Sequence, residues 1–115
     1  MDTIISPVDI LGGLLSEEGL VLSGSPGNFS LAPGILGSDG AASAIHIDSP
    51  VVSRRHCLVM QRGGRYFLRD LETTNGTWVN GHRLVGDRQV EIGAGDRIRI
   101  ANLDFVVKKE DEADA

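Results

Sequence analysis

The chain has 115 residues, a net charge of −5, 41% apolar residues and 15 glycines. This length provides one self-supporting core but not two domains, and the many glycines without a long helical repeat favour short elements joined by tight turns. The negative charge excludes duplex nucleic acid as an expected partner, because binding it requires a basic surface. No apolar run is long enough to span a bilayer, so we expect no membrane partner.

The distribution of charge and the single cysteine narrow the possibilities further. All eleven Lys and Arg residues lie at Arg54 or later, whereas the first 53 residues hold six carboxylates. Any positively charged site must therefore come from the second half of the chain. Cys57 has no partner for an internal disulfide and lies in a strand-like run, which predicts a buried thiol in a reducing compartment. With no basic leader at its start, the chain is expected to be cytoplasmic.

The first 19 residues are predicted to be an N-terminal extension. Their apolar side chains recur at helical spacings, but Gly12 and Gly13 interrupt them, and each interior glycine costs a helix about 1 kcal/mol. This pattern fits a short helix, an added edge segment or a frayed end.

Short strands are predicted from residue 20 onward. A turn-rich cluster at residues 23–27 separates the first two, and a loop of small residues at 38–43 follows the third. Pro50 lies just after the fourth, where a ladder donor is not needed. The four predicted strands of this half are residues 20–22, 28–31, 35–37 and 44–47.

The second half supplies the clearest hairpin, in which Gly63 and Gly64 connect residues 56–61 to residues 65–71. Both faces of residues 56–61 are apolar, which favours a central strand. Further strands are predicted at residues 77–79, 89–92, 97–100 and 103–107. Together these patterns predict an all-β fold, a two-sheet β-sandwich of ten to eleven short strands over residues 20–108, followed by an acidic, solvated tail at residues 109–115.

Two Asn-Gly pairs frame the most distinctive stretch, since Asn75-Gly76 and Asn80-Gly81 each provide a backbone suited to positive φ. This stretch reads LRDLETTNGTWVNG, it follows SRRH at residues 53–56, and a GD-x-I-x-I segment comes after it. The combination resembles the forkhead-associated (FHA) domain family over roughly residues 20–108. The resemblance implies a β-sandwich that binds phosphothreonine peptides as a protein–protein interaction module.

The resemblance also implies which residues contact the ligand. Ser53 and Arg54 match the pair that contacts the phosphate, and a hydroxyl and a guanidinium suit such an acceptor-rich group. Thr74 matches a threonine beside the phosphothreonine, and Asn75 matches an amide that hydrogen-bonds the peptide backbone. The alternative for Asn75 is that it serves only its turn.

Other residues are expected to serve the fold. The resemblance implies that His56 ties neighbouring loops together by hydrogen bonds. Trp78 and Phe67 are predicted to fill the core, because the chain has only five aromatic residues. The residues expected to have a structural role are Gly37, His56, Gly76, Asn80 and Gly81.

One position departs from the family pattern. FHA domains that bind phosphothreonine usually carry Gly-Arg where this chain has Gly37-Ser38, and that arginine is a principal phosphate ligand. No cation precedes Arg54, and Asp39 adds a like charge. Ser38 therefore predicts a site with weakened phosphate binding. The alternative is a phosphate-independent assembly or scaffold module on the same fold, with an unphosphorylated protein partner.

Catalysis is not expected from this sequence. The histidines His46, His56 and His82 share no metal-ligand spacing with one another or with Cys57. His56 and Cys57 are adjacent, so they project to opposite faces of a strand and cannot act as a base and nucleophile pair. We therefore expect no enzyme, no metal and no cofactor.

Overall fold

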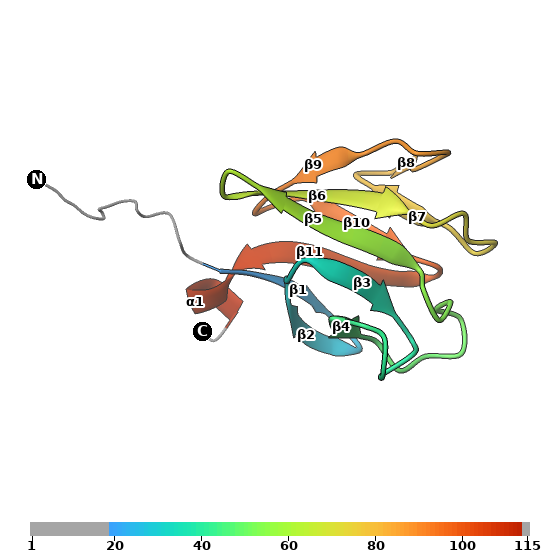
Figure 1. Ribbon diagram of the computed structural model, residues 1–115. Helices are drawn as coiled ribbons and strands as arrows, with labels where there is room; N and C mark the ends of the chain where they lie inside the picture. Colours follow the sequence, from blue (N-terminus) through green and yellow to red (C-terminus); the bar gives the residue numbers. More distant parts are fainter. Residues whose placement is uncertain (1–18, 114–115) are drawn as a thin grey trace, which may run out of the picture.

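The computed structural model describes residues 19–113, so nearly all of the predicted N-terminal extension lies outside the described residues. Within this range the chain forms eleven strands in two sheets and one four-residue helix, α1 (Glu110–Ala113) (Figure 1). The predicted all-β, two-sheet fold is confirmed. No helix of the described part has the length and hydropathy needed to cross a membrane.

The six-stranded sheet has the order β2-β1-β11-β10-β7-β8, and the five-stranded sheet has the order β4-β3-β5-β6-β9. All neighbours are antiparallel except β3 and β4, which are parallel. The strands are β1 (Leu20–Gly24), β2 (Gly27–Ser30), β3 (Gly34–Gly37), β4 (Ile45–His46), β5 (Cys57–Arg62), β6 (Arg65–Asp70), β7 (Thr77–Val79), β8 (His82–Arg83), β9 (Val90–Ile92), β10 (Arg97–Ile100) and β11 (Leu103–Lys109).

The core lies between the sheets and is built from the inward half of each alternating strand. In β10, Ile98 and Ile100 are buried while Arg97 and Arg99 are exposed. The largest fully buried side chain is Phe105 of β11. Burying a side chain of this size stabilises the fold by about 1.5–3 kcal/mol. The period-two alternation thus decides which residues remain available on the outer faces.

Several connections differ from a simple chain of hairpins. Asn80 and Gly81 both have positive φ and form the tight turn between β7 and β8. Strand β8 was not predicted from the sequence pattern. Strands β9 and β10 are consecutive but lie in different sheets, because β9 pairs with β6 and β10 pairs with β7 and β11. Strand β11 continues through Lys109 and is followed by α1.

The prediction that Trp78 and Phe67 fill the core is wrong. Both are half-buried on outer faces, where the guanidinium of Arg83 lies 5.3 Å from the ring centre of Trp78 and that of Arg62 lies 4.2 Å from that of Phe67. The pleat explains the position of Trp78: its two neighbours in β7 are buried, so the residue between them must point outward.

Candidate functional site

Four connections meet at one end of the sandwich, the right-hand end in Figure 1: β3–β4, β4–β5, β6–β7 and β10–β11. Backbone hydrogen bonds join them. The Ser38 amide donates to the Ser53 carbonyl at 3.0 Å, and the Ala101 amide donates to the Gly76 carbonyl at 2.9 Å. These bonds fix the relative positions of loops that are far apart in the sequence.

Gly37 allows the first two of these loops to approach each other. A Cβ at this position would collide with the carbonyl group of Arg54, so a larger residue would push the β4–β5 loop away. The close approach brings Ser38 next to Ser53, and the amide of Asp39 donates to the Arg54 carbonyl at 3.4 Å. The structure therefore brings together the three residues that the sequence assigns to the phosphate.

The side chains at this point are accessible. Arg54 is exposed, and its guanidinium has no hydrogen-bond or ion-pair partner within residues 19–113. Asp39 is half-buried, and one of its carboxylate oxygens accepts a hydrogen bond from the Ala41 amide at 3.1 Å, which holds the loop of small residues as a turn. The Arg54 guanidinium is thus available to a ligand, and Asp39 places a carboxylate on the adjoining loop.

The buried side chain of His56 links the β4–β5 loop to the β6–β7 loop. Its ring is fully buried, and Nδ1 accepts a hydrogen bond from the Ser53 amide at 3.0 Å. Nε2 therefore carries the proton in the neutral ring and donates to the Gly76 carbonyl at 2.8 Å. This one side chain holds the loop with Arg54 at a fixed distance from the loop with Asn75.

A buried carboxylate organises the β6–β7 loop, and the sequence analysis missed it. Asp70 accepts hydrogen bonds from the Thr73 amide at 2.9 Å, the Thr73 hydroxyl at 2.8 Å and the Thr77 hydroxyl at 2.7 Å. Thr73 in turn accepts from the Gly76 amide at 3.0 Å. A strand-ending Asp with Thr three residues later is a local pattern that could have indicated this turn.

Thr74 and Asn75 are exposed at the tip of that loop. The Asn75 amide nitrogen donates to the Val51 carbonyl at 2.9 Å, so it bridges to the β4–β5 loop. The Arg83 guanidinium donates to the Thr74 carbonyl at 3.2 Å from the other side. The hydroxyl of Thr74 and the amide oxygen of Asn75 have no partner within residues 19–113.

A groove of about 260 Å³ adjoins this tip. It joins the tip of the β6–β7 loop to the β4–β5 loop and the β10–β11 turn. The groove is lined by Val51, Asn75, Ala101 and Asn102.

The thiol of Cys57 lies beneath the site but takes no part in it. Burial raises the pKa of the thiol above its ordinary value of 9.0, and the neighbouring carboxylate of Asp70 raises it further. The thiol is therefore protonated at neutral pH, and a protonated, buried thiol is a poor nucleophile. Within residues 19–113 no group of three His, Cys, Asp or Glu side chains could hold a metal ion.

An FHA domain family model matches residues 34–101, more than half of the chain, and the chain therefore belongs to the FHA domain family of protein–protein interaction modules. The transcriptional regulatory protein EmbR of Mycobacterium tuberculosis is 36% identical over 61 residues, which are 53% of this chain and 15% of that protein. The chain thus matches only a small part of the length of these curated relatives.

Solved FHA domains share the same sandwich. The structure of M. tuberculosis EmbR in complex with a low affinity phosphopeptide is 28% identical, covers 80% of this chain and 24% of its own, and has a TM-score of 0.68. The FhaA FHA domain, complexed with the intracellular domain of another protein, is 30% identical, covers 78% of this chain and 98% of its own, and has a TM-score of 0.64.

Proposed function

We propose that this chain binds a phosphothreonine-bearing segment of a partner protein with the loops that follow β3, β4 and β6. Ser53 and Arg54 contact the phosphate, Thr74 lies beside the phosphothreonine, and Asn75 bonds the peptide backbone. The observation that carries the proposal is the exposed guanidinium of Arg54, which has no partner within residues 19–113, on the loop whose backbone bonds to Ser38 and Asp39. The phosphopeptide bound by the similar EmbR structure supports the same choice of ligand.

The affinity should be low for a physical reason. A charge-assisted hydrogen bond contributes about 1.5–3 kcal/mol, and this site offers one arginine where two would double the number of such donors. Where the family usually has a second arginine, Ser38 supplies only a hydroxyl, and Asp39 adds a negative charge beside it. The phosphate is therefore held mainly by Arg54 and by hydroxyl groups.

A second candidate function is a phosphate-independent assembly module on the same fold. Ser38 favours it, since the position next to Ser53 carries no cation. The bond from Asn75 to the Val51 carbonyl also favours it, because the amide nitrogen then stabilises the loops in the absence of a ligand. The two candidates differ in whether restoring a cation restores affinity for phosphate.

Titration calorimetry with matched phosphothreonine, phosphoserine and unphosphorylated peptide pools tests the proposal. Ser38→Arg should strengthen phosphothreonine binding about ten- to a hundredfold and steepen its salt dependence, because it adds one charge-assisted bond. Ala94→Arg adds the same charge in the exposed β9–β10 connection, at the opposite end of β10, and should change affinity little. If both the native chain and Ser38→Arg fail to bind any phosphorylated pool, the assembly module stands instead.

We also propose a cytoplasmic location. It is supported by the single cysteine, which is buried as a free thiol, the state that a reducing compartment maintains.

A further inference from the structure

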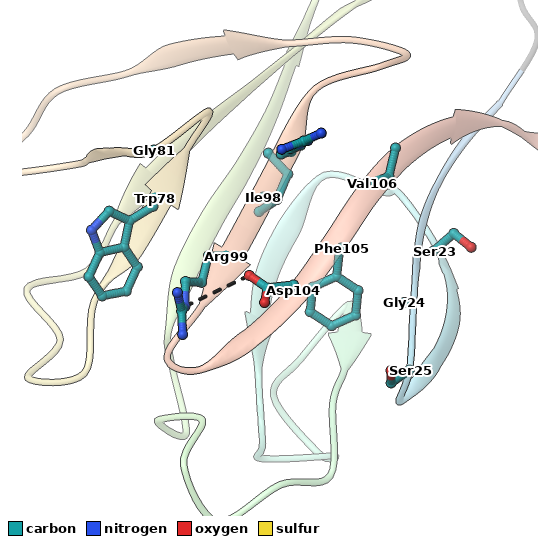
Figure 2. A pocket seen from close by; sticks show the side chains of 11 residues that line it. Ser23, Gly24, Ser25, Trp78, Gly81, Ile98, Arg99, Asp104, Phe105 and Val106 are labelled. Atoms are coloured by element: carbon teal, nitrogen blue, oxygen red, sulfur yellow. Dashed lines mark ion pairs between the residues drawn. The ribbon is translucent and has the colours of Figure 1, made fainter.

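The outer face of the six-stranded sheet carries a row of four side chains that runs across its strands. The strand register aligns Asp104 with Arg99, Arg99 with Trp78, and Trp78 with Arg83. Trp78 and Arg99 point outward, since both neighbours of each along its strand are buried, and the register places the exposed Asp104 and Arg83 on the same face. Figure 2 shows three of these residues side by side, with the ion pair between Arg99 and Asp104 as a dashed line.

Trp78 occupies the centre of this row and is held in place. The guanidinium carbons of Arg83 and Arg99 lie 5.3 Å and 5.9 Å from the centre of its ring, so the ring has a cation from each neighbouring strand. The ring also rests against the β6–β7 turn, because a Cβ on Gly76 would lie only 2.7 Å from its Cη2 atom. A half-buried tryptophan fixed in this way presents a preformed contact surface.

A groove of about 750 Å³ opens beside the ring, on the face of the sheet and not among the loops described above. Two arginines, Arg97 and Arg99, line the groove against one carboxylate, Asp104. A third arginine, Arg83, lies against the Trp78 ring outside the groove. The Arg99–Asp104 pair measures 3.8 Å between exposed side chains, so it is weak and replaceable. The lining includes Ser23, Ser25, Trp78, Arg97, Arg99 and Asp104.

We propose that this face is a second docking surface, which binds an extended acidic segment of a partner protein without any phosphate. Tryptophan and arginine are the residue types that carry most of the binding energy at protein interfaces. A cationic face on a chain of net charge −5 selects an anionic ligand by charge complementarity. Asp and Glu side chains of the segment pair with Arg97 and Arg99, and an apolar residue covers the ring of Trp78.

The experiment uses the full chain and a short unphosphorylated peptide of Glu, Asp and Leu, with a matched peptide in which Gln and Asn replace the acids. Trp78 is the only tryptophan, so its fluorescence reports binding at this face directly. We expect a saturable change with the acidic peptide alone, weakened by salt. Amide resonances of β7, β10 and β11 should shift in the nuclear magnetic resonance spectrum.

Paired variants locate the binding. Arg97→Gln combined with Arg99→Gln should lower the affinity about tenfold or more, since it removes two charge-assisted bonds. Arg62→Gln is the control: it also removes a guanidinium from an aromatic ring, but on the outer face of the other sheet, and should change the affinity less than about twofold. Thermal melting checks that all variants fold.

Four results would overturn the proposal. They are no binding at low salt, an equal loss with Arg62→Gln, resonance shifts centred on the loops of the proposed phosphothreonine site, and tighter binding of a single-stranded oligonucleotide than of the acidic peptide. A fifth result, binding that appears only after residues 1–18 are removed, would also overturn it, because the chain's own N-terminal segment would then be the occupant. Phosphothreonine binding, measured on the same double variant, should be unchanged, so failure of one proposal is distinguishable from failure of the other.

Discussion

Arg54 and His56 are two residues apart, yet their environments are opposite. Arg54 is exposed and has no partner within the described residues, whereas His56 is fully buried and bonds to both Ser53 and Gly76. A side chain of the first kind can bind a ligand, and one of the second kind holds loops in position. This contrast leads to a prediction for the two alanine variants.

Arg54→Ala should weaken phosphothreonine binding by about 1.5–3 kcal/mol and leave the melting temperature nearly unchanged, because it removes a charge-assisted bond from the surface. His56→Ala should destabilise the fold by about 2–4 kcal/mol, because it leaves the Ser53 amide and the Gly76 carbonyl unpaired. Calorimetric titration and thermal melting of both variants check this. A His56→Ala chain of unchanged stability that no longer binds would contradict the assignment.

At this scale the sequence names candidate binding residues more readily than the residues that support them. The residues of SRRH and TTNG are recognisable because the resemblance to a family implies a role for each by position, and those roles stay predictions. Asp70 was missed although its spacing to Thr73 is a local signal for a turn, because its third bond, from the Thr77 hydroxyl, is made inside the fold and no sequence pattern shows it. Trp78 was misplaced because an aromatic residue in a strand faces the core or the solvent according to a pleat phase that only the folded strand fixes.

Strand β3 ends at a point where two backbones touch, and this contact decides how the β4–β5 loop is held. A Cβ on Gly37 would collide with the Arg54 carbonyl, whereas a Cβ on Gly93, between β9 and β10, would meet no atom within 4 Å. Gly37 therefore positions the loop that carries Arg54, whereas the space beside Gly93 is free to accept a side chain. The two glycines form a matched pair for testing.

Gly37→Ala should lower the free energy of unfolding by about 1–3 kcal/mol, the cost of overpacking, and should also weaken phosphothreonine binding because it displaces Arg54. Gly93→Ala should stay within about 0.5 kcal/mol of the native chain, as most surface substitutions do. Chemical denaturation and peptide titration of the two variants measure both effects. Equal stabilities would show that the β4–β5 loop yields without cost.

The strands themselves were largely predictable, because alternation and turn residues are local signals. The prediction for residues 77–79 coincides with β7, and the hairpin at Gly63-Gly64 is the β5–β6 pair. Which sheet each strand joins was not predictable. Strands β9 and β10 are connected by a short turn that suits a hairpin, yet they separate into different sheets, because each pairs with strands distant in the sequence.

In the whole molecule the ends of the described chain are joined. Leu20 pairs with Lys109, and the Glu110 amide donates to the Gly19 carbonyl at 2.9 Å. We propose that residues 20–108 form the folding unit and that Lys109 and α1 close it. A fragment of residues 20–108 should fold but be less stable than residues 19–113 by about 1–2 kcal/mol, the value of one or two hydrogen bonds.

Chemical denaturation of the two fragments checks this prediction. A shorter fragment as stable as the longer one would show that the pairing at Lys109 contributes nothing, and an unfolded shorter fragment would show that the closing contacts are essential. Because Leu20 and Lys109 are 89 positions apart, β1 cannot pair with β11 until nearly all of the described chain has been made.

Strand β11 lies between β1 and β10, so without it the six-stranded sheet consists of two unconnected parts, β2-β1 and β10-β7-β8. Among the eleven described strands β11 leaves the ribosome last, after the β5–β6 hairpin has been able to form. Until then β1 and β10, which carry the core residues Leu22 and Ile98, have no strand between them. The two parts of the sheet therefore stay separate, and open to chaperones or to aggregation, until β11 has emerged.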